Sequence, residues 1–168
     1  MGFKKTSDLV AVSFGVAETG ANTYTEDEIA LQLDILNNEI FVVLSVDLDL
    51  VSPDGIAATD TSTIGAVSST TQAAIGNMSE SNVLATARSD IQAAGFADAG
   101  VSFQRAAMES YTGDLDYIAL IATNNFFIGV QGVGNVAAKG MTGRLWGYRA
   151  KADASTYAAL VQSEVLSS

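Results

Sequence analysis

The sequence predicts an all-β protein whose strands pack as a two-sheet sandwich, with a short helix at the C-terminal end. Apolar residues alternate with polar ones over several short stretches. Segments rich in Gly, Asn and Pro separate these stretches at the spacing typical of a sandwich. The chain has 168 residues and no cysteine, so we expect one domain, residues 1–168, that packing alone stabilises.

The clearest predicted strand covers residues 40–50. Alternation there places one set of apolar residues on a single face, which we expect to lie in the core: Ile40, Val42, Leu44, Val46, Leu48 and Leu50. The opposite face begins with Phe41 and Val43 and becomes acidic at Asp47 and Asp49. The turn residues 53–55 end the strand. Asn37 and Asn38 predict a tight turn from the alternating stretch 29–33, so the two stretches are expected to form a hairpin.

The C-terminal half contains a second group of predicted strands. Apolar runs at 115–122 and 126–130 are short and bounded by turn residues, which favours buried strands. A glycine-rich hairpin turn is expected at 132–135. Residues 144–150 alternate again, with Arg144, Trp146, Tyr148 and Ala150 on one face. Weaker strands are predicted at 9–16, 64–68, 83–88 and 101–107.

Two stretches have helical character. Asp153 is a suitable N-cap for a terminal helix that carries Tyr157, Leu160, Val161 and Val165 on one side. Residues 89–94 predict a weaker helix. Residues 55–82 are rich in Ser, Thr, Ala and Gly and predict a long external loop.

Charge is scarce and mostly negative. The net charge is −11, and fourteen of the nineteen carboxylates lie in residues 1–100, against Lys4, Lys5 and Arg88. Such a field repels phosphate, so no strong nucleic-acid binding is expected. Only 16% of the residues are charged, below the roughly 25% of an average soluble domain. Much of the surface is therefore small and uncharged or covered by neighbouring chains.

Several catalytic classes lack their residues. Without histidine or cysteine, Ser-His-Asp and Cys-His catalysis and His-ligated zinc are excluded. Carboxylate-pair glycoside hydrolysis needs neither residue, but nothing selects a pair among the acids. The G-x-G-x-x-A match at 132–137 lacks the βαβ context of a dinucleotide site. We predict no enzymatic activity and no cofactor.

Two binding alternatives stay open. Asp47, Asp49 and Asp54 lie close in sequence and offer the oxygen ligands that calcium prefers, although their spacing is not that of an EF-hand. A solvated acidic strand end is the alternative interpretation. Trp146 and Tyr148 could form a carbohydrate platform, although aromatic residues on strands more often belong to a core or an interface.

Part of the chain resembles a known family. The segments DYIALIATNNFFIGVQGVGN (116–135) and KGMTGRLWGYRAKAD (139–153) look like the closing strands of jelly-roll coat proteins from small tailless or archaeal-type viruses. EIFVVLSVDLDLVSPDG (39–55) is similar to their long early strand. The resemblance implies a single jelly roll of eight strands with Greek-key connections, without catalytic residues.

The function expected from these features is that of a virion structural protein, a self-assembling capsid subunit. Its partners would be many copies of itself and other virion proteins, and no apolar run is long enough for a transmembrane segment. The expected interface residues lie at the chain ends: Phe3, Lys4, Lys5, Tyr157, Leu160 and Val161. The alternatives are a tail, fibre, decoration or spike protein, a cellular filament, or a calcium- or carbohydrate-binding module.

Overall fold

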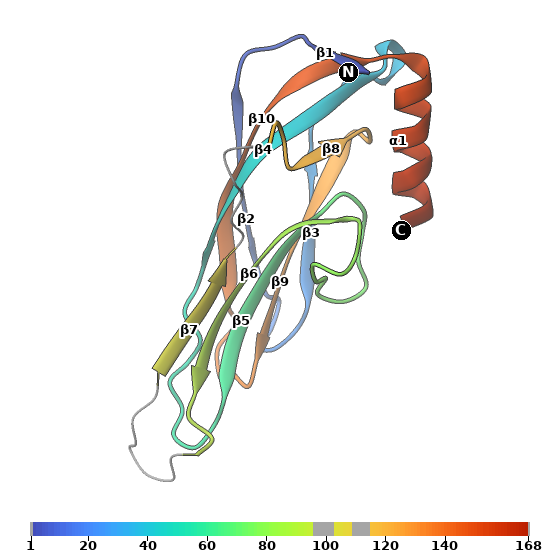
Figure 1. The fold of residues 1–168 in the computed structure, drawn as a ribbon. Helices are drawn as coiled ribbons and strands as arrows, with labels where there is room; N and C mark the ends of the chain where they lie inside the picture. The colour runs from blue at the N-terminus through green and yellow to red at the C-terminus, as the bar shows by residue number, and fades with distance from the viewer. Residues whose placement is uncertain (1, 96–102, 109–114, 168) are drawn as a thin grey trace.

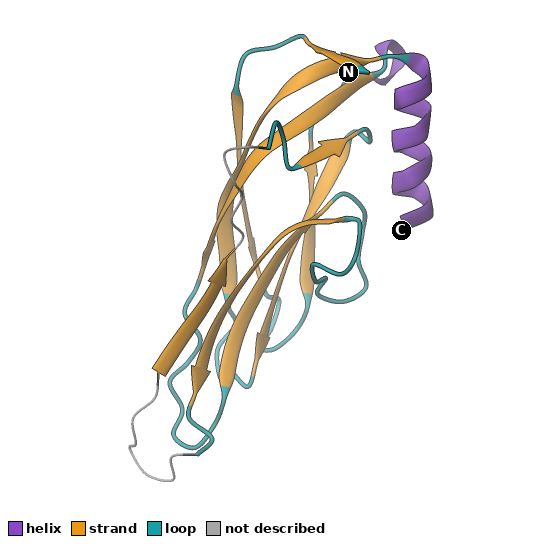
Figure 2. Cartoon of the chain, viewed as in Figure 1, coloured by secondary structure: helices purple, strands orange, loops and turns teal. Residues whose placement is uncertain are grey.

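A computed structural model of the chain describes residues 2–95, 103–108 and 115–167. Strands dominate these ranges, and an α-helix lies at their C-terminal end (Figure 2). In chain order the elements are β1 (Phe3–Lys5), β2 (Val10–Ala17), β3 (Thr25–Ala30), the 3-10 helix η1 (Ile35–Asn37), β4 (Glu39–Leu50), β5 (Thr61–Ser68), β6 (Val83–Gln92), β7 (Phe103–Met108), β8 (Ala119–Ile121), β9 (Asn125–Val133), β10 (Gly140–Ala152) and α1 (Ala154–Ser167). No helix in these ranges is long and apolar enough to cross a membrane.

The strands form two antiparallel sheets (Figure 1). In sheet A, β10 pairs with β4 on one side and with β2 and the short β1 on the other, and β4 also pairs with β8. Sheet B has the order β3-β9-β5-β6-β7. When β1 and β7 are set aside, the first remaining strand pairs with the last, the second with the last but one, and so on. The pairs are β2 with β10, β3 with β9, β4 with β8 and β5 with β6. This nested pairing is the arrangement of a jelly roll, so the predicted all-β jelly-roll fold with a C-terminal helix is confirmed.

A bulge in β4 changes which of its side chains face the core. The register with β10 shifts between Trp146 and Gly147, which lie opposite Ser45 and Val43, so Leu44 is the extra residue. One extra residue reverses the alternation of side chains from that point onward. The apolar residues of β4 are therefore divided between two faces of sheet A.

The main core lies between the two sheets and receives side chains from both halves of β4. Phe41 and Val43 enter it before the bulge, and Val46, Leu48 and Leu50 pack against it after the bulge. Its largest fully buried side chains include Phe126, Ile121, Ile128, Met141 and Leu145. The prediction of one core face running from residue 40 to residue 50 is therefore wrong. Asp47 and Asp49 are exposed, as expected.

A second apolar cluster lies on the outer face of sheet A, where α1 covers the sheet. Ile40, Val42 and Ala150 are fully buried there, and Leu44 packs against them. The helix begins as predicted, because the Asp153 carboxylate accepts a hydrogen bond from the Thr156 N–H at 2.8 Å. This hydrogen bond is the main reason why the pKa of Asp153 lies below its ordinary value.

Two other expectations need correction. The stretches 29–33 and 40–50 form no hairpin, because β3 belongs to sheet B and β4 to sheet A. Asn38 does turn the chain, with a φ of 57°, but the turn carries it from one sheet to the other. Strand β4 is apolar on both faces at its start, so it needs a central position in a covered sheet. Residues 89–94, expected to be helical, mostly continue β6.

The other predicted elements are found with changed limits. Strands β2, β5 and β6 overlap the predicted strands at 9–16, 64–68 and 83–88. The expected loop 55–82 contains β5, which is largely buried. Only Ala119–Ile121 is a strand within 115–122. Strand β7 matches the strand predicted at 101–107, whose first two residues lie outside the described residues.

Candidate assembly surfaces

The loops at one end of the sandwich are held together by a buried carboxylate, that of Glu18. This side chain is only 6% exposed. Its carboxylate accepts hydrogen bonds from three backbone N–H groups, those of Thr23 at 2.7 Å, Gly132 at 2.9 Å and Lys139 at 2.8 Å. Glu18 therefore joins the β2–β3 loop to both ends of the β9–β10 loop.

Asn135 connects the same loops to the β4–β5 connection. Its backbone N–H donates to Asn22 Oδ1 at 2.8 Å, and its carbonyl accepts from Asn22 Nδ2 at 2.8 Å. Its side chain accepts from the Asp54 N–H and donates to the Ser62 carbonyl, both at 2.9 Å. Gly134 precedes it at a φ of +71°, where a Cβ would lie 2.6 Å from the Asp60 carbonyl oxygen. The turn expected at 132–135 is thus present, but it joins the two sheets and forms no hairpin.

Asp54 completes this network with a charge. Its carboxylate contacts Lys139 Nζ at 2.6 Å and accepts from the N–H groups of Val136 and Ala137. The Lys139 hydrogen bond, followed by the two backbone donors, lowers the pKa of Asp54 to about 2. Lys139 is itself buried, so this ion pair fixes the β9–β10 loop on the β4–β5 connection.

The stabilisation from Asp54 should disappear in acid. Because the pKa is lowered in the folded chain, the contribution is complete above the unfolded pKa near 4 and is lost as the pH falls towards 2. We expect the melting temperature of the wild type to exceed that of Asp54→Asn at about pH 5, and the gap to close by about pH 2. Thermal melts followed by circular dichroism would measure it. A gap that stays constant over this pH range would contradict the assignment.

Apolar side chains stand exposed on this loop framework. Val136 is 78% exposed, Val51 50% and Val133 47%. All three lie within three residues of a member of the hydrogen-bonded network. Figure 1 shows the β2–β3 and β9–β10 loops at the same end of the molecule, away from α1. We call Val51, Val133 and Val136 the loop-end surface.

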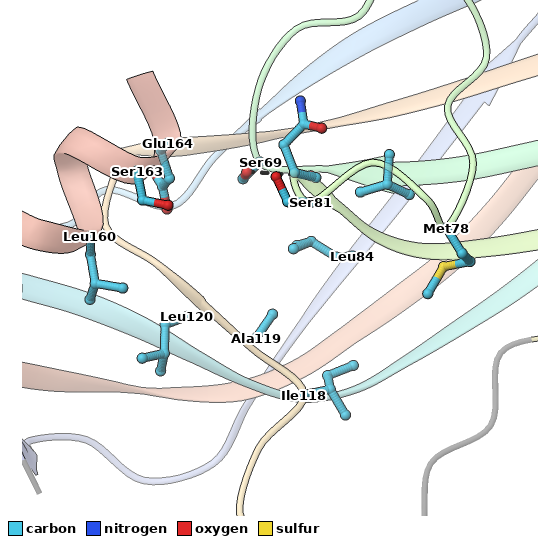
Figure 3. A pocket seen from close by; sticks show the side chains of 12 residues that line it. Ser69, Met78, Ser81, Leu84, Ile118, Ala119, Leu120, Leu160, Ser163 and Glu164 are labelled. Carbon is cyan, nitrogen blue, oxygen red and sulfur yellow. Dashed lines mark hydrogen bonds between the residues drawn. The ribbon is translucent and has the colours of Figure 1, made fainter. Parts of the chain in front are cut away.

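A cavity of about 290 Å³ opens on the flank of the sandwich, between the second half of α1, β8 and the start of β6 (Figure 3). Its apolar lining includes Leu84, Ile118, Leu120 and Leu160, and Met78 at its rim is 53% exposed. Glu164 borders it and holds α1 to the β8–β9 turn, because its carboxylate accepts from Ala122 N–H at 2.9 Å and Thr123 N–H at 3.1 Å. We call this opening the flank cavity.

The predicted interface residues at the chain ends pack largely on their own chain. Phe3, Tyr157, Leu160 and Val161 lie against the second apolar cluster, on the outer face of sheet A. Phe3 contacts the Tyr117 ring edge-on, with centroids 5.8 Å apart. Val165, expected on the same side of the helix, is instead exposed. Contact of these residues with another subunit remains a prediction.

The two N-terminal lysines differ in their surroundings. Both side chains are exposed on β1. Lys5 Nζ lies 5.0 Å from the centroid of the Tyr148 ring, a cation–π distance. Lys4 lies opposite Lys151 on β10, so this edge of sheet A carries two neighbouring positive charges.

The carboxylates proposed for calcium have separate surroundings. Asp47 accepts from Trp146 Nε1 at 2.9 Å, whereas Asp54 pairs with Lys139 in the loop network. Asp49 lies near Asp47, two residues along the same strand. Asp60 accepts from the N–H groups of Ala93 and Ala94 and so fixes the end of β6. Within 2–95, 103–108 and 115–167, no group of three or more acidic side chains is arranged to hold a metal ion.

The comparisons with known proteins identify no family. No family model matches the sequence, and no curated protein matches it. Among solved structures, a chain from Desmodium yellow mottle tymovirus is similar over 88% of this chain and 91% of its own length, with 10% sequence identity and a TM-score of 0.29. The jelly-roll assignment rests on the strand pairing described above.

Proposed function

We propose that this chain is a structural protein that assembles with copies of itself, as a coat subunit of a closed viral shell. The observation that carries the proposal is that exposed apolar side chains stand at two separate places on one jelly roll, the valines of the loop-end surface and Met78 at the rim of the partly polar flank cavity. Two different surfaces allow one subunit to contact several neighbours, which a closed shell requires. Exposed apolar patches of this kind commonly mark association sites.

The loop-end surface suits this role because its backbone is already fixed. The Glu18, Asn135 and Asp54 contacts hold the loops that carry the three valines. A surface that needs no ordering on contact loses little conformational entropy in binding. A repeating shell also requires that every copy presents the same shape.

Two of the sheet edges, in contrast, are poor sites for association. Strand β3, at one edge of sheet B, carries three successive acids, Glu26, Asp27 and Glu28. Strand β8, at one edge of sheet A, has three residues. Acidic or very short edge strands oppose strand addition and fibril growth. Growth by strand addition at these two edges is therefore disfavoured.

A double substitution tests the loop-end surface. Val133→Asp with Val136→Asp should convert assembled particles to monomers or small oligomers, because each new carboxylate would be buried against a neighbour and add to a charge of −11. Sedimentation velocity of the purified full-length chain would measure this. Leu9→Asp makes the same change at an exposed leucine outside the loop-end surface and should leave particle size unchanged.

Each outcome of this experiment is informative. Folding of the double variant is checked by its melting temperature, since both valines are exposed in the monomer. Unchanged particles in the double variant would exclude the loop-end surface as a contact. Rods in place of closed particles would favour a fibre or filament component.

A further inference from the structure

The outer face of sheet A has an uncovered part that the assembly proposal does not use. Beyond the area covered by α1, β2, β10 and β4 lie side by side in register, with residues in three rows: Ala11, Trp146 and Ser45; Ser13, Arg144 and Asp47; Gly15, Thr142 and Asp49. The β2 side chains are small in every row, whereas larger side chains stand on β10, and the β4 side carries Asp47 and Asp49 in the second and third rows. The result is a shallow groove along the sheet.

The charged groups that line this groove are neighbours without direct contact. Arg144 and Asp47 are opposite in register, yet within the described ranges no ion pair joins them. Arg144 Nε is instead 3.2 Å from Ser13 Oγ, and Asp47 Oδ2 accepts from Trp146 Nε1 at 2.9 Å. The Asp49 carboxylate has no hydrogen-bond or ion-pair partner among the described residues. The groove therefore presents a guanidinium and two carboxylates to solvent.

The size and chemistry of the groove indicate a class of ligand. Its volume is about 450 Å³, within the range of about 300–1,000 Å³ typical of small-molecule sites. A carboxylate only accepts hydrogen bonds and a guanidinium only donates them, so together they match hydroxyl groups, which do both. Trp146 lies beside this volume on β10, where it donates to Asp47, and its half-buried ring offers an aromatic surface for the apolar face of a sugar ring.

The local charge decides between neutral and anionic ligands. Asp47 and Asp49 outnumber Arg144, and the chain as a whole carries −11. A phosphate or a sialic acid would be repelled by both carboxylates. We propose that the groove lined by Ser13, Asp47, Asp49, Thr142 and Arg144, with Trp146 beside it, is a binding site for neutral carbohydrate. On a particle that displays many copies, even weak sites of this kind would attach it to a glycan surface by avidity.

Trp146 provides a direct readout, because it is the only tryptophan of the chain. Its fluorescence should change saturably when the full-length protein is titrated with neutral disaccharides such as maltose, lactose and cellobiose. The titration uses the protein in whichever assembly state sedimentation shows, so failure of the site and failure of assembly are measured separately. N-acetylneuraminic acid and inorganic phosphate serve as anionic probes and should cause no saturable change.

Variants locate the site. Asp49→Ala and Arg144→Ala should each lower the affinity for the disaccharide that binds best by at least about tenfold. This is the loss expected when a hydroxyl group of the ligand loses a charged partner. Asp27→Ala, an exposed carboxylate on sheet B, should leave the affinity unchanged. Asp49→Asn provides a conservative second variant, and far-UV circular dichroism verifies folding. The proposal is overturned if no disaccharide gives a saturable change by fluorescence and by saturation-transfer NMR. Equal affinity in Asp49→Ala and the wild type, or preferred binding of an anionic probe, would also overturn it.

Discussion

Glu18→Ala is expected to lower the free energy of unfolding by about 3–5 kcal/mol, because it leaves three backbone N–H groups without their acceptor and each costs about 1–3 kcal/mol when buried. Two of these donors, Gly132 and Lys139, lie in buried positions, so water can relieve only part of the loss. Urea denaturation followed by circular dichroism would measure the change.

Matched carboxylate variants control the Glu18 experiment. Glu28→Ala removes an exposed carboxylate on β3 that, among the described residues, accepts only from the Asn125 side chain, so its cost should stay within about 0.5 kcal/mol. Glu18→Gln keeps the shape but replaces one acceptor oxygen with a donor, so its cost should lie between the two. If Glu18→Ala proves as mild as Glu28→Ala, Glu18 does not hold the loops together.

Phe41→Ala is the second substitution with a large expected effect. It should lower the free energy of unfolding by about 3–5 kcal/mol. The ring is 1% exposed in the main core. It packs closely over Gly147, where a Cβ would lie 2.5 Å from the ring edge. Because Gly147 has no side chain, it offers no atoms to fill the space left by the ring. Leu44→Ala should cost less, about 1–2 kcal/mol, because Leu44 is half-buried at the bulge.

Comparison of these two variants tests the position of the bulge. A continuous alternation from Ile40 to Leu50 would place Leu44 in the core and Phe41 on the opposite face, which reverses the expected order of the two effects. Equilibrium denaturation, analysed with one m-value for both variants, would give the two changes in free energy of unfolding. A greater loss for Leu44→Ala would mean that the bulge is misplaced.

The bulge also shows what the sequence could not predict. Residues 40–43 are all apolar, so the pattern does not distinguish the core face from the face under α1. The extra residue is defined only by the pairing of β4 with β10, a strand about one hundred residues later. The two-sheet class, in contrast, follows from short alternating stretches and turn residues, which are local signals.

The loop network could not be predicted either, because its partners are also far apart in the sequence. Glu18, Asn22 and Asn135 lie in separate turns, and nothing in their local sequence indicates a shared contact. Gly134 gave a local signal for a turn, but the partners of that turn come from the β2–β3 and β4–β5 connections. The sequence does predict the apolar side of α1 as a contact surface, and in the structure this side packs on sheet A of its own chain.

Electron microscopy of the purified full-length protein tests the central claim most directly, because self-assembly into a closed shell is visible in single images. We expect closed particles of uniform diameter, in greater number at high salt, where repulsion between the carboxylates of neighbouring subunits is screened. A protein that remains monomeric at high concentration, in both low and high salt, would contradict the proposed function.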